Sequence, residues 1–355
     1  MRDRSLDFLK GVACLMMILA HAPVQIPPSW GLCFFIANMA PAVFFPITGI
    51  TTLYQIKKRN LKVLFCFYAI FFVLGFSYNA LWHTFYFTRD LVSDILQIVA
   101  IAVLIIAVFE KAGFKDYSYM FLVPLLLHLL LTNTVTSNFF LREFIMPPGV
   151  FTLLPWLGFF LYGVYMYKHS LLANIINTII LLLLLILYNG KFFSSDKWNM
   201  DASYFFASLF LFSMLFIVTR GLKNVEVPII NYFGRNSLMF LYTHILFMRK
   251  YVRYFKLSQA SLTFFIISII GVYVFMLIAT RLNEFTLARL SNNVAFWAIL
   301  LVNVIILPFA TKNVEIIVNI SYIIGIIFAL NYHNLMKLIE TKLQWFSKSD
   351  KMDVV

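Results

Sequence analysis

The stretch RDRSLDFLKGVACLMMILAH, from Arg2 to His21, is the segment from which the architecture of this chain is best inferred. It is apolar over most of its length and has ionisable groups near both ends, which is typical of a membrane helix with a polar stripe. That stripe, within about 60° at 100° per residue, holds Asp7, Lys10, Cys14, Ile18 and His21. A rise of 1.5 Å per residue separates Asp7 from His21 by about 21 Å, most of the thickness of a hydrocarbon core. We predict that this face turns away from lipid.

Two interpretations of the stripe are open. Arg2, Arg4 and Lys10 also fit the positive-inside rule, and His21 fits an interfacial helix end before Pro23. Against this, an ionisable group inside the membrane costs about 2.5 to 3.5 kcal/mol at mid-depth and less near the edge, so such groups usually face a cavity or a partner.

Composition places the chain among helical membrane proteins. Hydrophobic residues make up 62% and charged residues 12% of its 355 positions, with 40 Phe and a mean hydropathy of +0.88. A soluble globule of ordinary composition does not reach these values. We predict an all-α fold, a polytopic transmembrane helical bundle of about 10–12 spans, in the cell (plasma or inner) membrane.

Apolar segments recur along the whole chain. They lie near residues 8–22, 31–54, 61–81, 91–109, 117–131, 150–166, 171–188, 202–219, 237–248, 260–280, 293–310 and 315–331. Most of the 28 Lys and Arg fall in alternate loops when the N-terminus is cytoplasmic, so we predict that orientation. Four cations oppose the bias, because this topology puts them outside: Arg249, Lys250, Arg253 and Lys256. The first apolar run has no small-residue cleavage site, so we expect a retained helix.

Charge and cysteine content exclude other classes. The net charge of +13 comes from basic residues scattered between spans, which argues against a nucleic-acid partner. Cys14, Cys33 and Cys66 are an odd number without metal-ligand spacing, so neither a disulfide framework nor a metal site is expected. We predict that all three are small core hydrophobes.

Basic groups gather on the predicted cytoplasmic side. The densest cluster follows the second apolar segment and comprises Lys57, Lys58, Arg59 and Lys62, on the same side as Arg4 and Lys10. Cations of this kind bind anionic lipid headgroups or an anionic cofactor.

The stretch FGRNSLMFLYTHILF, residues 233–247, adds a helix start on the same side. Arg235 precedes it, and Ser237 or Asn236 is expected to cap it, which leaves amides directed at a phosphate-sized anion. His244 lies about 10 Å deeper on the same face as Ser237. It is either a helix-to-helix hydrogen-bonding group or a functional one.

The predicted outer side has fewer ionisable groups. His83 follows the third apolar segment, and Arg142 and Glu143 lie in a longer loop polar enough to contact a hydrophilic substrate. Asp94 stands at the start of the next helix. It is either a favourable partner of the helix dipole or a group that faces the same vestibule as His21.

Five stretches together resemble a known family. In chain order they are RSLDFLKGVACLMMILAH, APAVFFPITG, SDILQIVAIAVL, LLPWLGFFLYGVYM and FGRNSLMFLYTHILF, which cover roughly residues 1 to 248. The series resembles the heparan-α-glucosaminide N-acetyltransferase family and its bacterial relatives, and more distantly the multispanning acyltransferases that acetylate cell-surface glycans. The last hundred residues or so match no motif.

The resemblance implies a membrane acyltransferase. Such an enzyme takes an acetyl group from cytoplasmic acetyl-CoA and delivers it to a sugar hydroxyl or amine of a glycan on the far side. The family pattern places its Arg/Asp/Lys head on Arg4, Asp7 and Lys10, and the histidine of bacterial members on His21. Lysosomal members have a later histidine where Pro27 and Pro28 stand here, so His21 is our candidate general base or acyl carrier.

The expected site follows from both lines of reasoning. The catalytic candidates are His21 and Asp94. Acetyl-CoA is expected at Arg4, Asp7, Lys10, Lys57, Lys58, Arg59, Arg235, Ser237 and His244, and the glycan at His83, Arg142 and Glu143. An imidazole suits the base because its unperturbed pKa lies near 6.5.

We divide the chain into three parts and keep two other functions open. Residues 1–250 form the acyltransferase-like transmembrane core, 251–335 additional transmembrane helices, and 336–355 a cytoplasmic C-terminal tail. The alternative function is a transporter or flippase of an anionic or lipid-linked solute. The absence of matching broken helices in the two halves disfavours it. A membrane scaffold without catalysis is the third interpretation, and the oligomeric state is not determined by the sequence.

Overall fold

The computed structural model describes residues 3–82, 92–132, 134–135, 141–147, 149–187, 197–222 and 225–352. Over these residues the chain is helical, and its only β-type pairing is a single bridge between Gln25 and Gln259. Five helical segments among them are long and apolar enough to cross a membrane: Pro28–Lys58, Leu61–Asn79, Ala202–Gly221, Leu262–Phe285 and Val314–Gln344. The predicted all-α membrane bundle is confirmed at this level, while the span count and the orientation stay predictions.

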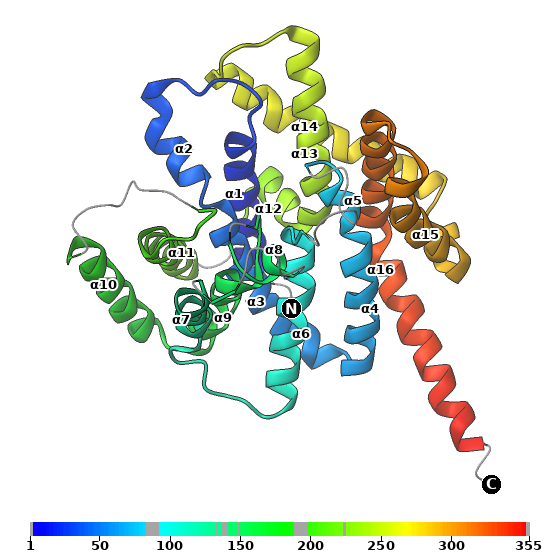
Figure 1. Cartoon of the computed structure of the whole chain (residues 1–355), viewed down its shortest axis with the longest axis horizontal. Helices are drawn as coiled ribbons and strands as arrows, with labels where there is room; N and C mark the ends of the chain where they lie inside the picture. The colour runs from blue at the N-terminus through cyan, green and yellow to red at the C-terminus, as the bar shows by residue number, and fades with distance from the viewer. Residues whose placement is uncertain are drawn as a thin grey trace.

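Within the described residues, each predicted apolar segment overlaps a helix over most of its length. In chain order the helices are α1 (Arg4–Ala20), α2 (Gly31–Ala37), α3 (Ala40–Lys58), α4 (Leu61–Leu74), α5 (Phe76–Asn79), α6 (Ile95–Lys111), α7 (Val123–Leu131), α8 (Arg142–Ile145), α9 (Leu153–Lys168), α10 (Leu171–Leu187), α11 (Ala202–Gly221), α12 (Pro228–Arg235), α13 (Ser237–Phe255), α14 (Leu262–Phe285), α15 (Val294–Ala310) and α16 (Val314–Met352). Figure 1 shows α10 at the edge of the bundle and the last part of α16 leaving it.

Helix α1 packs on several sides. It contacts α12, α3 and α13. A Cβ on Gly11 would lie 2.0 Å from the carbonyl oxygen of Ile230, and one on Gly234 would lie 1.8 Å from that of Asp7. The two helices therefore meet backbone to backbone, which glycine alone allows. Asp7, Cys14 and Ile18 are buried, so the predicted polar stripe does face the interior.

Helices α3 and α9 make a second close crossing. A Cβ on Gly49 would lie 2.1 Å from the carbonyl oxygen of Phe160, and one on Gly163 would lie 2.0 Å from that of Pro46. Each glycine thus accepts the backbone of the other helix. Gly49 and Gly163 therefore permit the close crossing of α3 and α9.

The C-terminal helices pack on the rest of the bundle. Helix α14 contacts α13, and α16 contacts α13, α4 and α5. Inside this part the side-chain amides of Asn283 and Asn331 donate to each other's oxygens at 3.1 and 2.7 Å, which satisfies two buried polar groups together. Helix α16 continues without a break past residue 336, where we divided the chain.

The prediction for the cysteines is wrong at two of three positions. Cys14 is buried, but Cys33 on α2 and Cys66 on α4 are exposed on the surface of the bundle. In a membrane helix an outward-facing apolar position contacts lipid, so apolar sequence alone does not separate core from lipid-facing residues.

We predict that Gly163→Ala destabilises the bundle. The added methyl group would overlap the backbone of Pro46, and overpacking of this kind costs about 1–3 kcal/mol. The matched control is Gly31→Ala on α2, where a Cβ meets nothing within 4 Å. Thermal unfolding of the detergent-solubilised variants measures the difference. Equal midpoints for the two variants would contradict the proposed α3–α9 contact.

Candidate functional site

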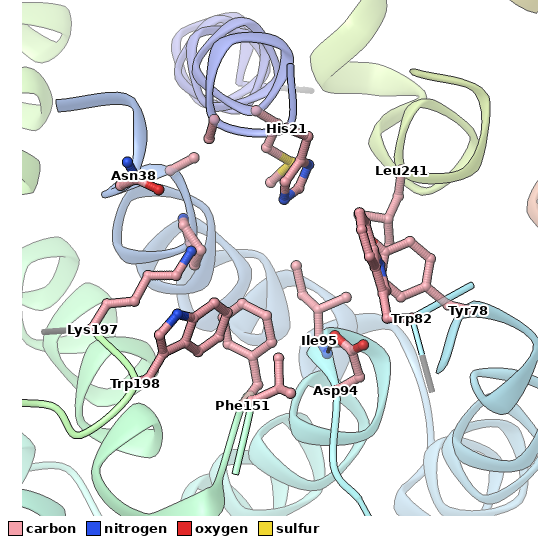
Figure 2. Close-up of a pocket in the computed structure, with 15 residues that line it drawn as sticks. His21, Asn38, Tyr78, Trp82, Asp94, Ile95, Phe151, Lys197, Trp198 and Leu241 are labelled. Atoms are coloured by element: carbon pink, nitrogen blue, oxygen red, sulfur yellow. Dashed lines mark hydrogen bonds between the residues drawn. The ribbon is translucent and has the colours of Figure 1, made fainter. Parts of the chain in front are cut away.

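A cavity of about 550 Å³ lies at the C-terminal end of α1. We call it the outer cavity. Its polar and aromatic lining comprises His21, Asn38, Tyr78, Trp82, Asp94, Phe151, Lys197 and Trp198 (Figure 2). These residues come from the end of α1, the α2–α3 junction, α5 and the residues after it, and the segments that precede α6, α9 and α11. Its volume is typical of small-molecule sites. The two predicted catalytic residues, His21 and Asp94, therefore line one cavity although 73 positions separate them in the chain.

His21 pairs with a second histidine. Its Nδ1 lies 2.9 Å from Nε2 of His244, and the two rings stack with centroids 5.2 Å apart. His244 is fully buried on α13, its ring lies parallel to that of Phe240 at 4.7 Å, and its Nδ1 lies 2.7 Å from the carbonyl oxygen of Phe240. The pair is thus anchored on a backbone carbonyl.

That carbonyl orients the protons of a neutral histidine pair. A carbonyl oxygen only accepts, so Nδ1 of His244 must donate to it, and Nε2 of His244 is then an acceptor. His21 must donate from Nδ1 to that acceptor, which leaves Nε2 of His21 with a lone pair. Figure 2 shows the His21 ring projecting from the end of α1 into the outer cavity. The arrangement presents a base to the cavity.

Trp82 lines the cavity and contacts both His21 and Arg249. The Trp82 ring lies 5.8 Å from the His21 ring, and the Arg249 guanidinium lies 4.7 Å from the Trp82 ring centroid. Arg249 follows His244 on α13, so the end of this helix lies on the His21 side of the bundle. The cation holds the indole by a cation–π contact.

Asp94 is both a helix cap and a cavity residue. It is the N-cap of α6, where its carboxylate accepts from the Ile95 amide at 2.6 Å and the Gln97 side chain accepts from the Asp94 amide at 3.2 Å. Asp94 thus stands at the start of α6, as a partner of the helix dipole would, and it also faces the same cavity as His21.

The pKa of Asp94, which precedes the helix, is shifted by its surroundings. Burial raises the pKa of its carboxyl group to about 7, although the Ile95 hydrogen bond and the charge of Lys197 lower it.

Sequence reasoning missed Lys197 and Trp198. They lie in the segment before α11, and the Lys197 ammonium is 4.2 Å from the Trp198 ring centroid. Burial lowers the pKa of Lys197 to about 8, although the charge of Asp94 raises it. A signal was present: a lysine beside a tryptophan in a predicted outer loop pairs a cation with an aromatic platform.

A second pocket, of about 420 Å³, lies at the other end of α1. We call it the inner pocket. Its charged and hydroxyl lining comprises Asp3, Asp7, Lys10, Thr51, Tyr54, Lys58, Arg235, Ser237 and Tyr332. Five of the residues predicted to bind acetyl-CoA therefore lie together, namely Asp7, Lys10, Lys58, Arg235 and Ser237. The close α1–α12 contact brings them there, because α12 ends at Arg235 and α13 begins at Ser237.

The other predicted cations lie next to the inner pocket or apart from it. Lys57 and Arg59 line a neighbouring open pocket of about 480 Å³, which shares Lys58 with the inner pocket. Arg59 pairs with Glu340 at 2.6 Å. Arg4 pairs with Glu226 at 2.5 Å and does not line the inner pocket.

The remaining predicted site residues that the structure describes line neither pocket. His244 lies against His21 and away from the predicted donor groups. Arg142 and Glu143 are on α8, where Arg142 donates to the carbonyl oxygen of Val135 at 2.9 Å, and neither lines the outer cavity. His83 lies outside the described residues.

The predicted cap of α13 is wrong. Asn236 occupies the N-cap position, but neither its side chain nor that of Ser237 caps the helix. The side-chain amide of Asn236 donates instead to the carbonyl oxygen of Tyr232 at 2.9 Å, because α12 leads into α13 through this one residue. The start of α13 is therefore a junction between two helices.

Packed side chains separate the two pockets. They share no lining residue, and along α1 the buried Cys14 lies between Lys10 and Met17. From α3, the Phe44 ring lies 5.7 Å from the Lys10 ammonium. Lys10 and His21 are separated by about 16 Å along the helix.

Comparison with protein-family models, with curated proteins and with solved structures finds no match for this chain. Among the described residues, no three His, Cys, Asp or Glu side chains are grouped as metal ligands would be.

We predict that His21 is the Nδ1-protonated tautomer when both rings are neutral. A long-range ¹H–¹⁵N spectrum of histidine-labelled protein distinguishes the tautomers by the shifts of the ring nitrogens. In His244→Phe the acceptor is lost and the His21 tautomer preference should disappear. His169→Gln is the matched control, since His169 lies at the end of α9 and does not line the cavity. An Nε2-protonated His21 in the wild-type protein would contradict the geometry.

Proposed function

We propose that this chain is an integral membrane acyltransferase that moves an acetyl group from acetyl-CoA to a sugar hydroxyl or amine. One observation carries the proposal: α1 has a basic pocket at one end and, at the other, a cavity into which a carbonyl-anchored histidine pair presents a base. The resemblance of five stretches to the heparan-α-glucosaminide N-acetyltransferase family points to the same chemistry.

The donor fits the inner pocket by charge. Lys10, Lys58 and Arg235 surround a concave site, and Asp3 and Asp7 within it leave a net positive balance. The adjoining pocket adds Lys57 and Lys111, so phosphate groups of CoA have cations on both sides of Lys58. Tyr54 and Tyr332 offer aromatic surface for the adenine.

The acceptor fits the outer cavity. Trp82 and Trp198 offer apolar ring faces of the kind that cover the C–H face of a sugar, and Asp94, Asn38 and Lys197 offer hydrogen-bonding groups for its hydroxyls. An acceptor hydroxyl within reach of Nε2 of His21 meets the lone pair that the histidine pair leaves open.

The proposed reaction balances as a simple acyl transfer. The acceptor oxygen attacks the thioester carbonyl as Nε2 of His21 removes its proton, so a C–O bond forms and the C–S bond breaks. The imidazolium then returns that proton to the CoA thiolate, which leaves as the thiol. His244 takes no proton in this scheme and holds the His21 ring in its orientation. In the acyl-carrier version, Nε2 of His21 attacks the thioester carbonyl first, so an N–C bond forms, the C–S bond breaks and the CoA thiolate leaves. The acceptor oxygen then takes the acetyl group from the imidazole, the N–C bond breaks, and the acceptor's proton goes to the thiolate.

The thioester must reach the outer cavity between the packed side chains. The pantetheine arm of CoA is long and thin, and about 16 Å along α1 separates Lys10 from His21. Phe44 and Cys14 are the side chains that would have to move apart, so we propose that donor binding opens this path.

A transporter of an anionic or lipid-linked solute stays the alternative, because pockets at both ends of a helix also fit a solute path. Purified protein in liposomes separates the two functions. Acetyl transfer to an external sugar without solute uptake supports the enzyme. Uptake of an anionic solute without loss of the acetyl group from acetyl-CoA would overturn it.

We predict that His21→Ala lowers acetyl transfer about 10²- to 10⁴-fold, the typical contribution of a general acid or base. Insertion should be unaffected because His21 ends α1 and is only half-buried. His169→Ala is the matched control. Transfer is measured with radiolabelled acetyl-CoA at equal protein in the membrane. Wild-type activity in His21→Ala would contradict the assignment of His21 as the general base.

We predict that Lys58→Gln combined with Arg235→Gln weakens acetyl-CoA binding about tenfold or more, because charge-assisted hydrogen bonds to phosphate are lost. The remaining binding should depend less on salt. Lys115→Gln combined with Lys342→Gln removes the same charge from exposed positions outside the inner pocket. Calorimetry at two salt concentrations measures both effects. Equal affinity in the two double variants would assign the inner cations to lipid or topology.

A further inference from the structure

An open groove of about 920 Å³ runs beside the last turns of α13. We call it the α13 groove. Phe247, Lys250, Tyr251 and Arg253 line it from α13, and Ile267 lines it from α14. It lies at the same end of the bundle as the outer cavity, since His244 precedes it on α13 by less than two turns. The two share no lining residue.

The groove is basic without nearby acidic groups. No Asp or Glu occurs between Glu226 and Glu284, whereas four cations occur between residues 249 and 256. Among the described residues, no carboxylate oxygen lies within the 4.0 Å of an ion pair from the side chains of Lys250 or Arg253. Cations also complement a helix C-terminus. The helix dipole explains why residues at this helix end are positively charged, but it does not explain why a groove lies beside them.

Stacked aromatic rings build the wall of the groove. The Tyr251 ring stacks on those of Phe247 and Phe264, with centroids 5.8 Å away in each case, and lies 5.1 Å from that of Phe255. Gly271 on α14 lets Phe247 approach, because a Cβ there would lie 2.0 Å from its ring. Contacts with three other rings hold the Tyr251 ring in place, so this wall of the groove is preformed.

An apolar strip continues from the groove along α14. Ile267 is 38% exposed, and Ile266, Ile270 and Val274 are 46%, 52% and 45% exposed. At the other end of the groove, Tyr254 is 80% exposed next to the cations. An amphipathic Tyr beside Lys and Arg is typical of the level of lipid headgroups, and an apolar strip beyond it is typical of the acyl-chain region.

We propose that the α13 groove binds an anionic phospholipid. Lys250 and Arg253 hold the phosphate headgroup, and an acyl chain lies along the exposed isoleucines of α14. A free phosphate ion would use the cations but not the apolar strip, and a soluble protein partner would not reach a strip that faces the membrane. The inference is independent of the acyltransferase proposal.

The lipid also explains an exception in the sequence. Arg249, Lys250, Arg253 and Lys256 oppose the charge bias that predicts a cytoplasmic N-terminus, because they lie at the His21 end of the bundle. Anionic headgroups in that leaflet supply the negative charge that the protein lacks there. Arg249, directly before Lys250 in the chain, contacts Trp82 of the outer cavity, so bound lipid would lie beside a cavity wall.

The test uses full-length protein in nanodiscs of phosphatidylglycerol and phosphatidylcholine. Native mass spectrometry after release counts the lipids that stay bound, and titration with phosphatidylglycerol in detergent gives the affinity. Lys250→Gln combined with Arg253→Gln should weaken phosphatidylglycerol binding about 25-fold, at about fivefold per cation near the membrane surface. Lys312→Gln combined with Arg281→Gln removes the same charge outside the groove and should leave binding unchanged.

Two further variants assign the binding to the groove. Gly271→Ala should displace Phe247 and weaken lipid retention with all cations present, while Gly221→Ala, which meets nothing within 4 Å, should not. Equal retention of phosphatidylglycerol and phosphatidylcholine by the wild-type protein would overturn the proposal. Equal loss of phosphatidylglycerol from the Lys250→Gln/Arg253→Gln variant and from the Lys312→Gln/Arg281→Gln control would also overturn it. Strong competition by millimolar inorganic phosphate would assign the site to a free anion instead.

Discussion

The backbone contact between α1 and α12 sets the positions of the groups on which both pockets depend. Gly11 and Gly234 let the two helices approach until main-chain atoms touch. Since α12 leads into α13 through the single residue Asn236, this contact also fixes how far along α1 the next helix begins. Ser237 therefore lies in the pocket that Lys10 lines, and α13 then rises beside α1. A bulkier residue at either glycine would separate the helices and move both polar sites.

The end of that parallel pair is where the histidines meet. In an apolar bundle an unpaired imidazole N–H or lone pair costs free energy, so polar groups are arranged in chains that end on the backbone. Here the chain runs from His21 through His244 to the carbonyl oxygen of Phe240. It has one remaining open acceptor, Nε2 of His21, and the outer cavity lies beside it. The packing that buries His244 thus also determines which His21 nitrogen is available.

The two ends of α1 differ in chemistry in a way that suits two different ligands. The inner pocket and its neighbour gather Lys and Arg from α1, α3, α6 and α12 around an open surface. The outer cavity has fewer charges, and its tryptophans and Asp94 come from segments that connect helices. Rigid helices hold the cations and the histidines, while connecting segments supply the tryptophans and Asp94 that line the outer cavity.

Much of the fold class could be predicted from the sequence, because hydropathy and segment length report directly on whether a helix crosses a bilayer. Within the described residues, each predicted apolar segment consists mostly of helix, and the polar stripe of the first helix faces inward. His21 and Asp94 line one cavity, and Lys10 and Arg235 line another pocket, which agrees with the expectation that ionisable groups in an apolar chain face cavities or partners.

Other features depended on contacts between distant segments. The His21–His244 pair joins residues 223 positions apart, and no local pattern reports such a pairing. Lys197 and Trp198 lie in a connecting segment without periodicity, and Cys66 is as apolar as a core residue although it faces outward. The sequence by itself determined which segments are apolar helices and which ionisable side chains cannot face lipid. Only the tertiary structure decided which of these ionisable side chains come together, because helix-to-helix packing in a membrane depends on shape and small residues and not on hydropathy.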